Sequence, residues 1–187
     1  MKKYKLTKHN SGDKFRIEAL INIPERDIVA GDFGGLVDGE HNLDQEGTCW
    51  IHYGASVVGN AKVSGSAAVG GYASVLENAV VKDTAVIHGN SIVYGNAVVE
   101  QNSVVCGTAQ VYGSAVIQGD AEIADDISVY GSATIKDKAL VLGNTHVTDQ
   151  AVVCGNAFVC GDYLIGEKAV VGGGMVLETS GIMVSVS

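Results

Sequence analysis

A six-residue repeat runs without interruption through most of the chain. Cut from Cys49, the sequence divides into 22 consecutive hexads up to Ser180, with no insertion or deletion. The third position is Val, Ile or Leu in all 22 hexads, the first is Ala in 15, and the fifth is Gly in 13. Short repeats of fixed period are typical of solenoids, in which each repeat packs against its neighbours. The repeat therefore constrains the fold more than any other feature of the chain.

The residue types at the six positions predict a short strand followed by a corner. Positions one and three are two residues apart, so their small and aliphatic side chains point to the same, inward side of an extended strand. Positions two and four point outwards and vary in type. Positions five and six carry the Gly and Asn residues that tolerate a sharp turn with positive φ. Three such sides make a triangular coil, and successive coils stack by parallel strand pairing at about 4.8 Å.

We therefore predict an all-β protein, a left-handed parallel β-helix of about seven coils. The left-handed form is an exception to the usual right-handed crossover rule, and αL corners favour it. Residues 49–187 form the β-helix in this prediction. Residues 1–48 break the hexad pattern and form a small N-terminal β cap with an imperfect first coil, because a solenoid needs a covered end. The cap begins with two strands, Tyr4–Thr7 and Phe15–Asn22, on either side of a polar turn at His9–Lys14.

Composition and charge exclude several classes of protein. The 187-residue chain has a formal net charge of −9, and its β-helix lacks the clustered Lys and Arg that nucleic-acid sites need. No run of about 18 apolar residues is available to span a membrane, and the basic first residues lead into no apolar segment like that of a signal peptide. Four cysteines without a CxxC pair are typical of reduced thiols in the cytoplasm. We expect no nucleic-acid or membrane partner and a cytoplasmic location.

The register of the repeat assigns the outward side chains to three faces. Taking every third hexad from Cys49 gives a first face whose outward residues are mostly apolar. A contiguous exposed apolar patch usually marks an interface, whereas scattered valines on a sheet surface are ordinary. We favour the interface and expect the chain to self-associate through this face, since closed cyclic symmetry covers such a patch. The candidate subunit interface comprises Val86, His88, Val104, Cys106, Leu140, Leu142 and Phe158.

Three tyrosines, Tyr94, Tyr112 and Tyr130, recur at an interval of 18 residues on the second face. Because they are one coil apart, their rings should lie above one another at about 4.8 Å, in offset contact. The ladder can stabilise the stacking of the coils, and it can also be a platform for a sugar, a base or a partner's side chain. The sequence leaves both interpretations open, so these residues are the candidate ligand or partner surface.

A zinc site is not expected. His52 and His88 share a column, but they are two coils, or about 9.6 Å, apart, and two ligands of one zinc lie much closer. Cys106 lies one coil beyond His88, and two ligands do not make a site. The cysteines also lack the paired histidine and acid that activate a nucleophile. We therefore assign no catalytic residue, no metal and no cofactor.

The repeat and the cap carry two resemblances to known proteins. The hexads of residues 49–180 resemble the hexapeptide-repeat family, whose members fold as left-handed parallel β-helices and commonly form trimers. The resemblance therefore implies a trimer before a dimer. The YKLT start at Tyr4–Thr7, the AGDFGGLV stretch at Ala30–Val37 and the NLDQEGTCWI junction at Asn42–Ile51 look like the YdcK-like group of that family, found in bacteria and their phages. That group is generally described as acetyltransferases because of the repeat. A phage origin fits the resemblance and would make host interaction or the sequestering of a small ligand a natural role.

Two functions remain open at this stage. The leading hypothesis is a non-catalytic structural or binding solenoid that self-associates. The alternative is an acyl-CoA-dependent acyltransferase with its active site between subunits, in which a histidine would act as general base toward a hydroxyl or an amine. Hexapeptide-repeat acyltransferases usually need a loop extruded from a coil or a neighbour's surface, and residues 49–180 contain no such loop. Bound acyl-CoA would favour the alternative.

Overall fold

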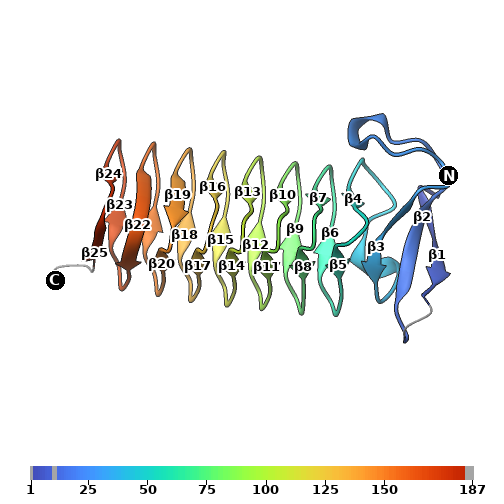
Figure 1. Ribbon diagram of the computed structural model, residues 1–187, viewed down its shortest axis with the longest axis horizontal. Coiled ribbons are helices and arrows are strands. Elements are labelled where there is room, and N and C mark those ends of the chain that lie inside the picture. Colours follow the sequence, from blue (N-terminus) through green and yellow to red (C-terminus); the bar gives the residue numbers. More distant parts are fainter. Residues whose placement is uncertain (1, 10–11, 184–187) are drawn as a thin grey trace.

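The computed structural model describes residues 2–9 and 12–183, and within them the chain forms a long parallel β-helix with a cap at its N-terminal end (Figure 1). Two predicted segments, the turn at His9–Lys14 and the last hexad, lie partly outside the described residues. The predicted all-β parallel β-helix with an N-terminal cap is confirmed.

Short strands recur at positions two and three of the hexads and stack in three parallel columns. The first face contains β4 (Trp50–Ile51), β7 (Ala68–Val69), β10 (Val86–Ile87), β13 (Val104–Val105), β16 (Glu122–Ile123), β19 (Leu140–Gly143), β22 (Phe158–Ile165) and β24 (Val176–Leu177). The second contains β3 (Phe33–Val37), β5 (Ser56–Val57), β8 (Ser74–Val75), β11 (Ile92–Val93), β14 (Gln110–Val111), β17 (Ser128–Val129), β20 (His146–Val147), the end of β22, and β25 (Ser180–Met183). The third contains β6 (Lys62–Val63), β9 (Val80–Val81), β12 (Val98–Val99), β15 (Val116–Ile117), β18 (Thr134–Ile135), β21 (Val152–Val153) and β23 (Val170–Val171).

The β-helix has about eight turns. The first of them precedes the regular hexads, in the segment for which the sequence predicted an imperfect first coil. It begins with Leu36 of β3, which pairs in parallel with Ser56, continues through Leu43, which bridges to Val63, and reaches β4. This first turn does not follow the six-residue spacing of the later turns.

The inward columns form the hydrophobic core. Residues at positions one and three are almost all fully buried, as Ala109 and Val111 illustrate in the middle of the helix. Small alanines alternate with branched aliphatic residues, so each coil fills its triangular interior without a large side chain. The predicted register, and with it the assignment of outward residues to faces, is therefore correct.

Each corner depends on a left-handed residue at position five. From the hexad that begins at Ala55 to the hexad that ends at Gly174, every position-five residue has a positive φ, and 13 of these 20 residues are glycine. Gly107 shows why, because a Cβ atom there would lie 2.5 Å from the backbone nitrogen one turn on. The seven other corner residues are Glu77, Asp83, Gln101, Asp125, Asp137, Asp149 and Glu167.

The six of these residues that precede Glu167 each accept a hydrogen bond from the backbone N–H of the corner one turn further along. Asp137, for example, accepts from the Gly155 amide at 2.9 Å, and the other five bonds measure 2.9 to 3.1 Å. An L-residue in the αL region is strained, and this bond offsets the strain by satisfying an exposed donor. These corner side chains, five carboxylates and the Gln101 amide, thus hold adjacent turns together.

The N-terminal cap is built on a hairpin. β1 (Tyr4–Lys8) and β2 (Phe15–Ala19) pair antiparallel, as the sequence predicted for these segments. β2 also pairs antiparallel with β3, and β3 pairs in parallel with β5. The hairpin therefore continues the second face of the β-helix and covers the edge of its first turn.

Lys3 closes the N-terminal end of the core. Its side chain is buried, and its ammonium donates hydrogen bonds to the carbonyl oxygens of Glu46 at 3.1 Å and Cys49 at 3.0 Å. The Cys49 Sγ lies 3.1 Å from the Lys3 Nζ. Next to it, the Tyr4 hydroxyl donates to the Leu43 carbonyl at 2.6 Å, and burial raises the pKa of Tyr4 well above its usual value. The first turn has no preceding turn to cover the N-terminal end of the core. The hydrogen bonds of Lys3 and Tyr4 close that end instead.

A flap, defined here as residues 20–32, folds over the start of the first face (Figure 1). It contains η1 (Pro24–Arg26), and the Arg26 guanidinium donates to the carbonyl oxygens of Thr48 and Ser66. Trp50, although at an outward position of β4, is fully buried. η1 and η2 (Glu40–Asn42) are the helices of the described residues, and neither has the length or the apolar character needed to cross a membrane.

Replacing Val111 by aspartate should unfold much of the β-helix. The substitution buries an unpaired carboxylate at a fully buried site, which we expect to lower the free energy of unfolding by about 3 kcal/mol or more. Chemical denaturation of Val111→Asp and of Gln110→Asp, which places the same charge at the exposed neighbouring position, measures the difference. Equal stability of the two variants would contradict the assigned register.

Removing the corner carboxylate of Asp137 should destabilise the protein without disturbing the core. Asp137→Ala loses the bond to the Gly155 amide and leaves an alanine at positive φ, at a cost of about 2 kcal/mol. Asp137→Asn keeps an acceptor oxygen and a residue type that tolerates αL, so it should remain within about 0.5 kcal/mol of wild type. If both variants melted alike in urea titrations, the corner bond would have no role.

Candidate functional site

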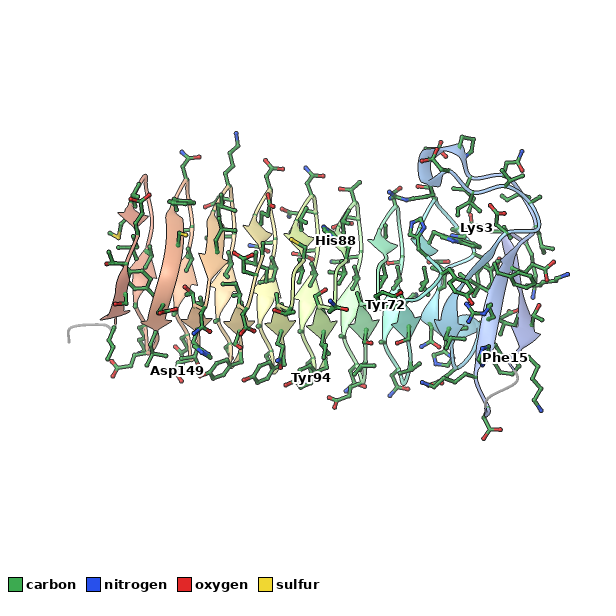
Figure 2. The ribbon with its side chains drawn as sticks, viewed as in Figure 1. Lys3, Phe15, Tyr72, His88, Tyr94 and Asp149 are labelled. Carbon is green, nitrogen blue, oxygen red and sulfur yellow. The ribbon has the colours of Figure 1, made fainter. Side chains whose placement is uncertain are left out.

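The tyrosine ladder exists as a stack of three rings on the second face. The ring centroids of Tyr94 and Tyr112 lie 4.8 Å apart at an interplanar angle of 8°, and those of Tyr112 and Tyr130 lie 5.0 Å apart at 7°. Figure 2 shows Tyr94 on a different side of the β-helix from His88. The sequence-based expectation that these three residues meet is thus fulfilled in the geometry, while their role as a binding surface remains a prediction.

Backbone pairing sets the spacing of the ladder. Each tyrosine stands at position four of its hexad, directly after β11, β14 or β17, and its amide donates to a carbonyl one turn on at 2.9 Å. The rings therefore use their faces to contact one another, and their edges and hydroxyl groups are what the ladder presents to solvent. A ligand would therefore contact ring edges and hydroxyl groups along the ladder.

The hydroxyl groups of the ladder are available for a ligand. Those of Tyr94, Tyr112 and Tyr130 form no hydrogen bond with any other residue in the described part of the chain. In contrast, the hydroxyls of Tyr4 and Tyr163 both have protein partners. Partial burial, and then the two neighbouring phenols, raise the pKa of Tyr112, so its hydroxyl is a neutral hydrogen-bond donor at ordinary pH.

The hexads of the ladder are uncharged and mostly polar, and the half-buried Ile92 beside Tyr94 is the apolar exception. The hexads that carry the three tyrosines, residues 91–96, 109–114 and 127–132, contain no charged side chain. An exposed amide, Gln110, and a half-buried hydroxyl, Ser128, lie at position two beside the rings. At the corner, Asn96 accepts a hydrogen bond from Asn78 at 3.1 Å. The ladder is therefore part of a neutral strip on an acidic molecule.

The seven residues of the candidate subunit interface all lie on the first face. Val86 pairs with Val104, and Leu140 pairs with Phe158, so the apolar side chains form two patches along the column. The exposed Glu122 separates these patches. All seven side chains are half-buried except His88, which is exposed: they are Val86, His88, Val104, Cys106, Leu140, Leu142 and Phe158.

Two titratable groups of the first face have shifted pKa values. Burial, and then the carboxylates of Glu122 and Asp125, raise the pKa of Cys106, which disfavours the nucleophilic thiolate. Burial, and then the Arg26 guanidinium, lower the pKa of His52. Across the described residues, no group of three or more His, Cys, Asp or Glu side chains is placed to hold a metal ion.

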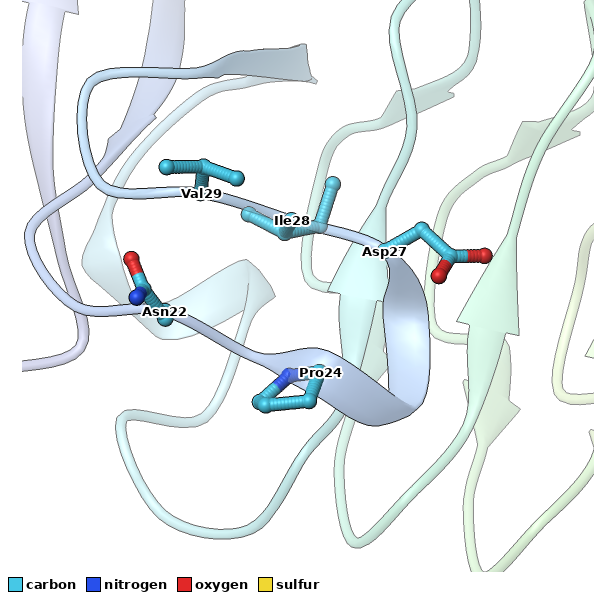
Figure 3. A pocket seen from close by; sticks show the side chains of 5 residues that line it. All are labelled: Asn22, Pro24, Asp27, Ile28 and Val29. Carbon is cyan, nitrogen blue, oxygen red and sulfur yellow. The ribbon is translucent and has the colours of Figure 1, made fainter.

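A hollow of about 350 Å³ lies in the flap (Figure 3). Asn22, Pro24, Asp27, Ile28 and Val29 line it, and the figure shows their side chains on the two arms of the flap. Its walls are mainly apolar, with Asp27 as the charged group. The Asn22 side-chain oxygen already accepts a hydrogen bond from the Ala30 amide at 2.9 Å. The hollow lies on the cap, away from the neutral strip.

The sequence analysis missed the contacts that the cap makes with the β-helix. Lys3 and Trp50 are buried, and the Arg16 guanidinium carbon lies 4.2 Å from the ring centroid of Tyr53. Tyr53 and Tyr72, both well exposed, project from the corner between the first and second faces. The exposed aromatic residue at position five of the first hexad, where later hexads usually have glycine, was the signal that could have marked this corner.

Comparison of the sequence with models of protein families and with curated proteins found no match. A functional proposal therefore rests on the geometry of two surfaces, the neutral strip and the apolar first face.

The raised pKa of Tyr112 predicts a loss of stability in alkaline solution. Because the folded-state pKa lies above the unfolded value of 10.0, the contribution is fully present below pH 10 and is lost as the pH rises beyond it. The free energy of unfolding should therefore fall more steeply above pH 10 for wild type than for Tyr112→Phe, which cannot ionise. Tyr72→Phe, outside the ladder, is the matched control. Parallel curves for wild type and Tyr112→Phe would show that the ladder does not perturb its central phenol.

Proposed function

We propose that the protein is a non-catalytic solenoid that self-associates through its first face. The observation that carries the proposal is the column of outward apolar side chains on a flat, continuous parallel sheet. Soluble proteins rarely leave such a stripe in contact with water. The regular stacking of the turns makes the face rigid, so a second copy can bind it without ordering loops first.

The second apolar patch is the better centre for a subunit contact. Leu140 and Phe158 are paired neighbours, Leu142 pairs with Cys160, and Val176, at the next turn, is 58% exposed. Large aliphatic and aromatic side chains in the middle of an interface contribute most of the binding energy. Glu122 borders this patch on the side of Val104, so its carboxylate lies between the two patches and not at the centre of the second.

Charge favours an apolar contact with closed symmetry. The chain carries a formal net charge of −9, so identical copies repel each other at long range, and ion pairs across the interface are scarce. Burial of the apolar patches has to outweigh this repulsion. A cyclic trimer keeps the acidic surfaces outside and covers each patch once, and we place it before a dimer.

The proposal also covers the protein family of the chain and its location in the cell. The six-residue repeat and the Tyr4–Thr7, Ala30–Val37 and Asn42–Ile51 stretches support membership of the hexapeptide-repeat family, in its YdcK-like bacterial and phage group. The four cysteines are all free, which supports a reducing compartment such as the cytoplasm. In that setting, a rigid assembly that binds a host component or a small ligand fits the surfaces better than an acyltransferase does.

Charging the second patch should dissociate the assembly. Leu142→Glu combined with Phe158→Glu places like charges across each contact, and we expect sedimentation to shift to the 19.3 kDa monomer while the far-ultraviolet spectrum stays unchanged. Val98→Glu combined with Val116→Glu makes a matched change on the third face and should leave the assembly intact.

A wild-type protein that sediments as a monomer at micromolar concentration would contradict the proposal. An equal effect of the two double variants would instead assign the loss to general destabilisation, and the first face would no longer be the interface.

A further inference from the structure

We propose that the neutral strip on the second face binds a neutral, extended, β-linked glycan that lies along the axis of the β-helix. The strip comprises the three stacked tyrosines and the polar side chains beside them: Tyr94, Tyr112, Tyr130, Gln110, Ser114, Ser128 and Ser132. This inference goes beyond self-association and does not depend on it, because the strip lies on the second face and the proposed interface lies on the first.

The hydrogen-bonding groups of the strip are unused by the protein. Among the described residues, the three phenol hydroxyls have no partner, and neither do the side chains of Gln110 and Ser128. Hydroxyl and amide groups both donate and accept hydrogen bonds, which matches the mixed donors and acceptors of sugar hydroxyls. The ring edges add apolar contact for the C–H groups of a sugar.

The charge of the strip selects an uncharged ligand. The three hexads of the strip carry no charge, while the molecule as a whole carries −9 and repels polyanions. Corner carboxylates one turn beyond either end of the ladder are engaged with the backbone, since Glu77 accepts from the Gly95 amide at 3.0 Å and Asp149 from the Glu167 amide at 2.9 Å. The exposed Asp126 lies at the corner directly before the Tyr130 hexad, and its carboxylate repels an anionic ligand at that end. No cation in the strip is available to hold a phosphate, sulfate or carboxylate.

The spacing of the strip selects a linear polymer. Equivalent groups repeat at the ring separations of 4.8 and 5.0 Å. An extended chain of β-linked hexoses advances by roughly the same distance per sugar, so each sugar can meet one tyrosine. The side chain at position two is polar beside Tyr112 and Tyr130, whereas beside Tyr94 it is the apolar Ile92. Three turns in register would bind three consecutive sugars, and the rigid backbone keeps these contacts in place before binding.

Calorimetric titration of the full-length protein with cellohexaose tests the proposal. We expect wild type to bind cellohexaose at least about tenfold more tightly than maltohexaose, whose α-linkages coil the chain out of register. Carboxymethylated cellulose, the anionic analogue, should bind more weakly than cellohexaose. Absence of binding to cellohexaose at millimolar concentration, or equal affinity for maltohexaose, would overturn the proposal.

Variants locate the site. Tyr112→Phe keeps the ring stack but removes the central hydroxyl, so its affinity should fall by about threefold to tenfold without a change in melting temperature. Tyr112→Ala should lose at least about tenfold. Tyr72→Ala removes a tyrosine that is 76% exposed outside the strip and should bind as wild type does. If Tyr72→Ala lost as much affinity as Tyr112→Phe, the glycan would bind elsewhere.

Sedimentation of the same samples separates this inference from the proposed function. A monomer that binds cellohexaose would contradict self-association alone. An oligomer that binds no glycan would contradict the glycan site alone.

Discussion

Equal turn length is the constraint on which the rest of the structure depends. Each turn pairs in parallel with the next only if every corner takes up the same number of residues, and the αL residue at position five achieves this. Glycine meets the requirement without strain, and Asp, Glu or Gln meets it with a hydrogen bond to the adjacent turn. The inward Ala and Val columns, the flat faces and the tyrosine ladder all follow from this register.

The sequence predicted most of the periodic structure and little of the non-periodic structure. The 18-residue spacing placed Tyr94 above Tyr112 correctly, because one register governs every turn. The burial of Lys3 and Trp50 was not predictable in the same way, since both depend on segments far away in the chain that carry no repeat. The orientation of the rings in the ladder was also beyond what the sequence could predict. The spacing predicted contact between the rings, whereas the structure shows that their edges and hydroxyl groups face solvent.

The two surfaces illustrate how one scaffold supports different chemistry. On the first face, apolar side chains lie next to one another on paired strands. On the second face, stacked phenol rings lie beside amide and hydroxyl groups. Neither surface needs a loop, because outward positions repeat every 18 residues on a rigid sheet. Changes of residue type at positions two and four can therefore alter a surface while the core stays the same.

The hairpin of the cap also determines where strands can be added. β1 is the outermost strand at the N-terminal end, because β2 pairs with it on one side and with β3 on the other. Its exposed residues include Lys5, which forms an ion pair with Glu18 at 2.9 Å, and Lys8. Lysines along an outer strand oppose pairing with the strand of another molecule. A stack of open-ended coils is a template for fibre growth, and this edge stops such growth at the N-terminal end.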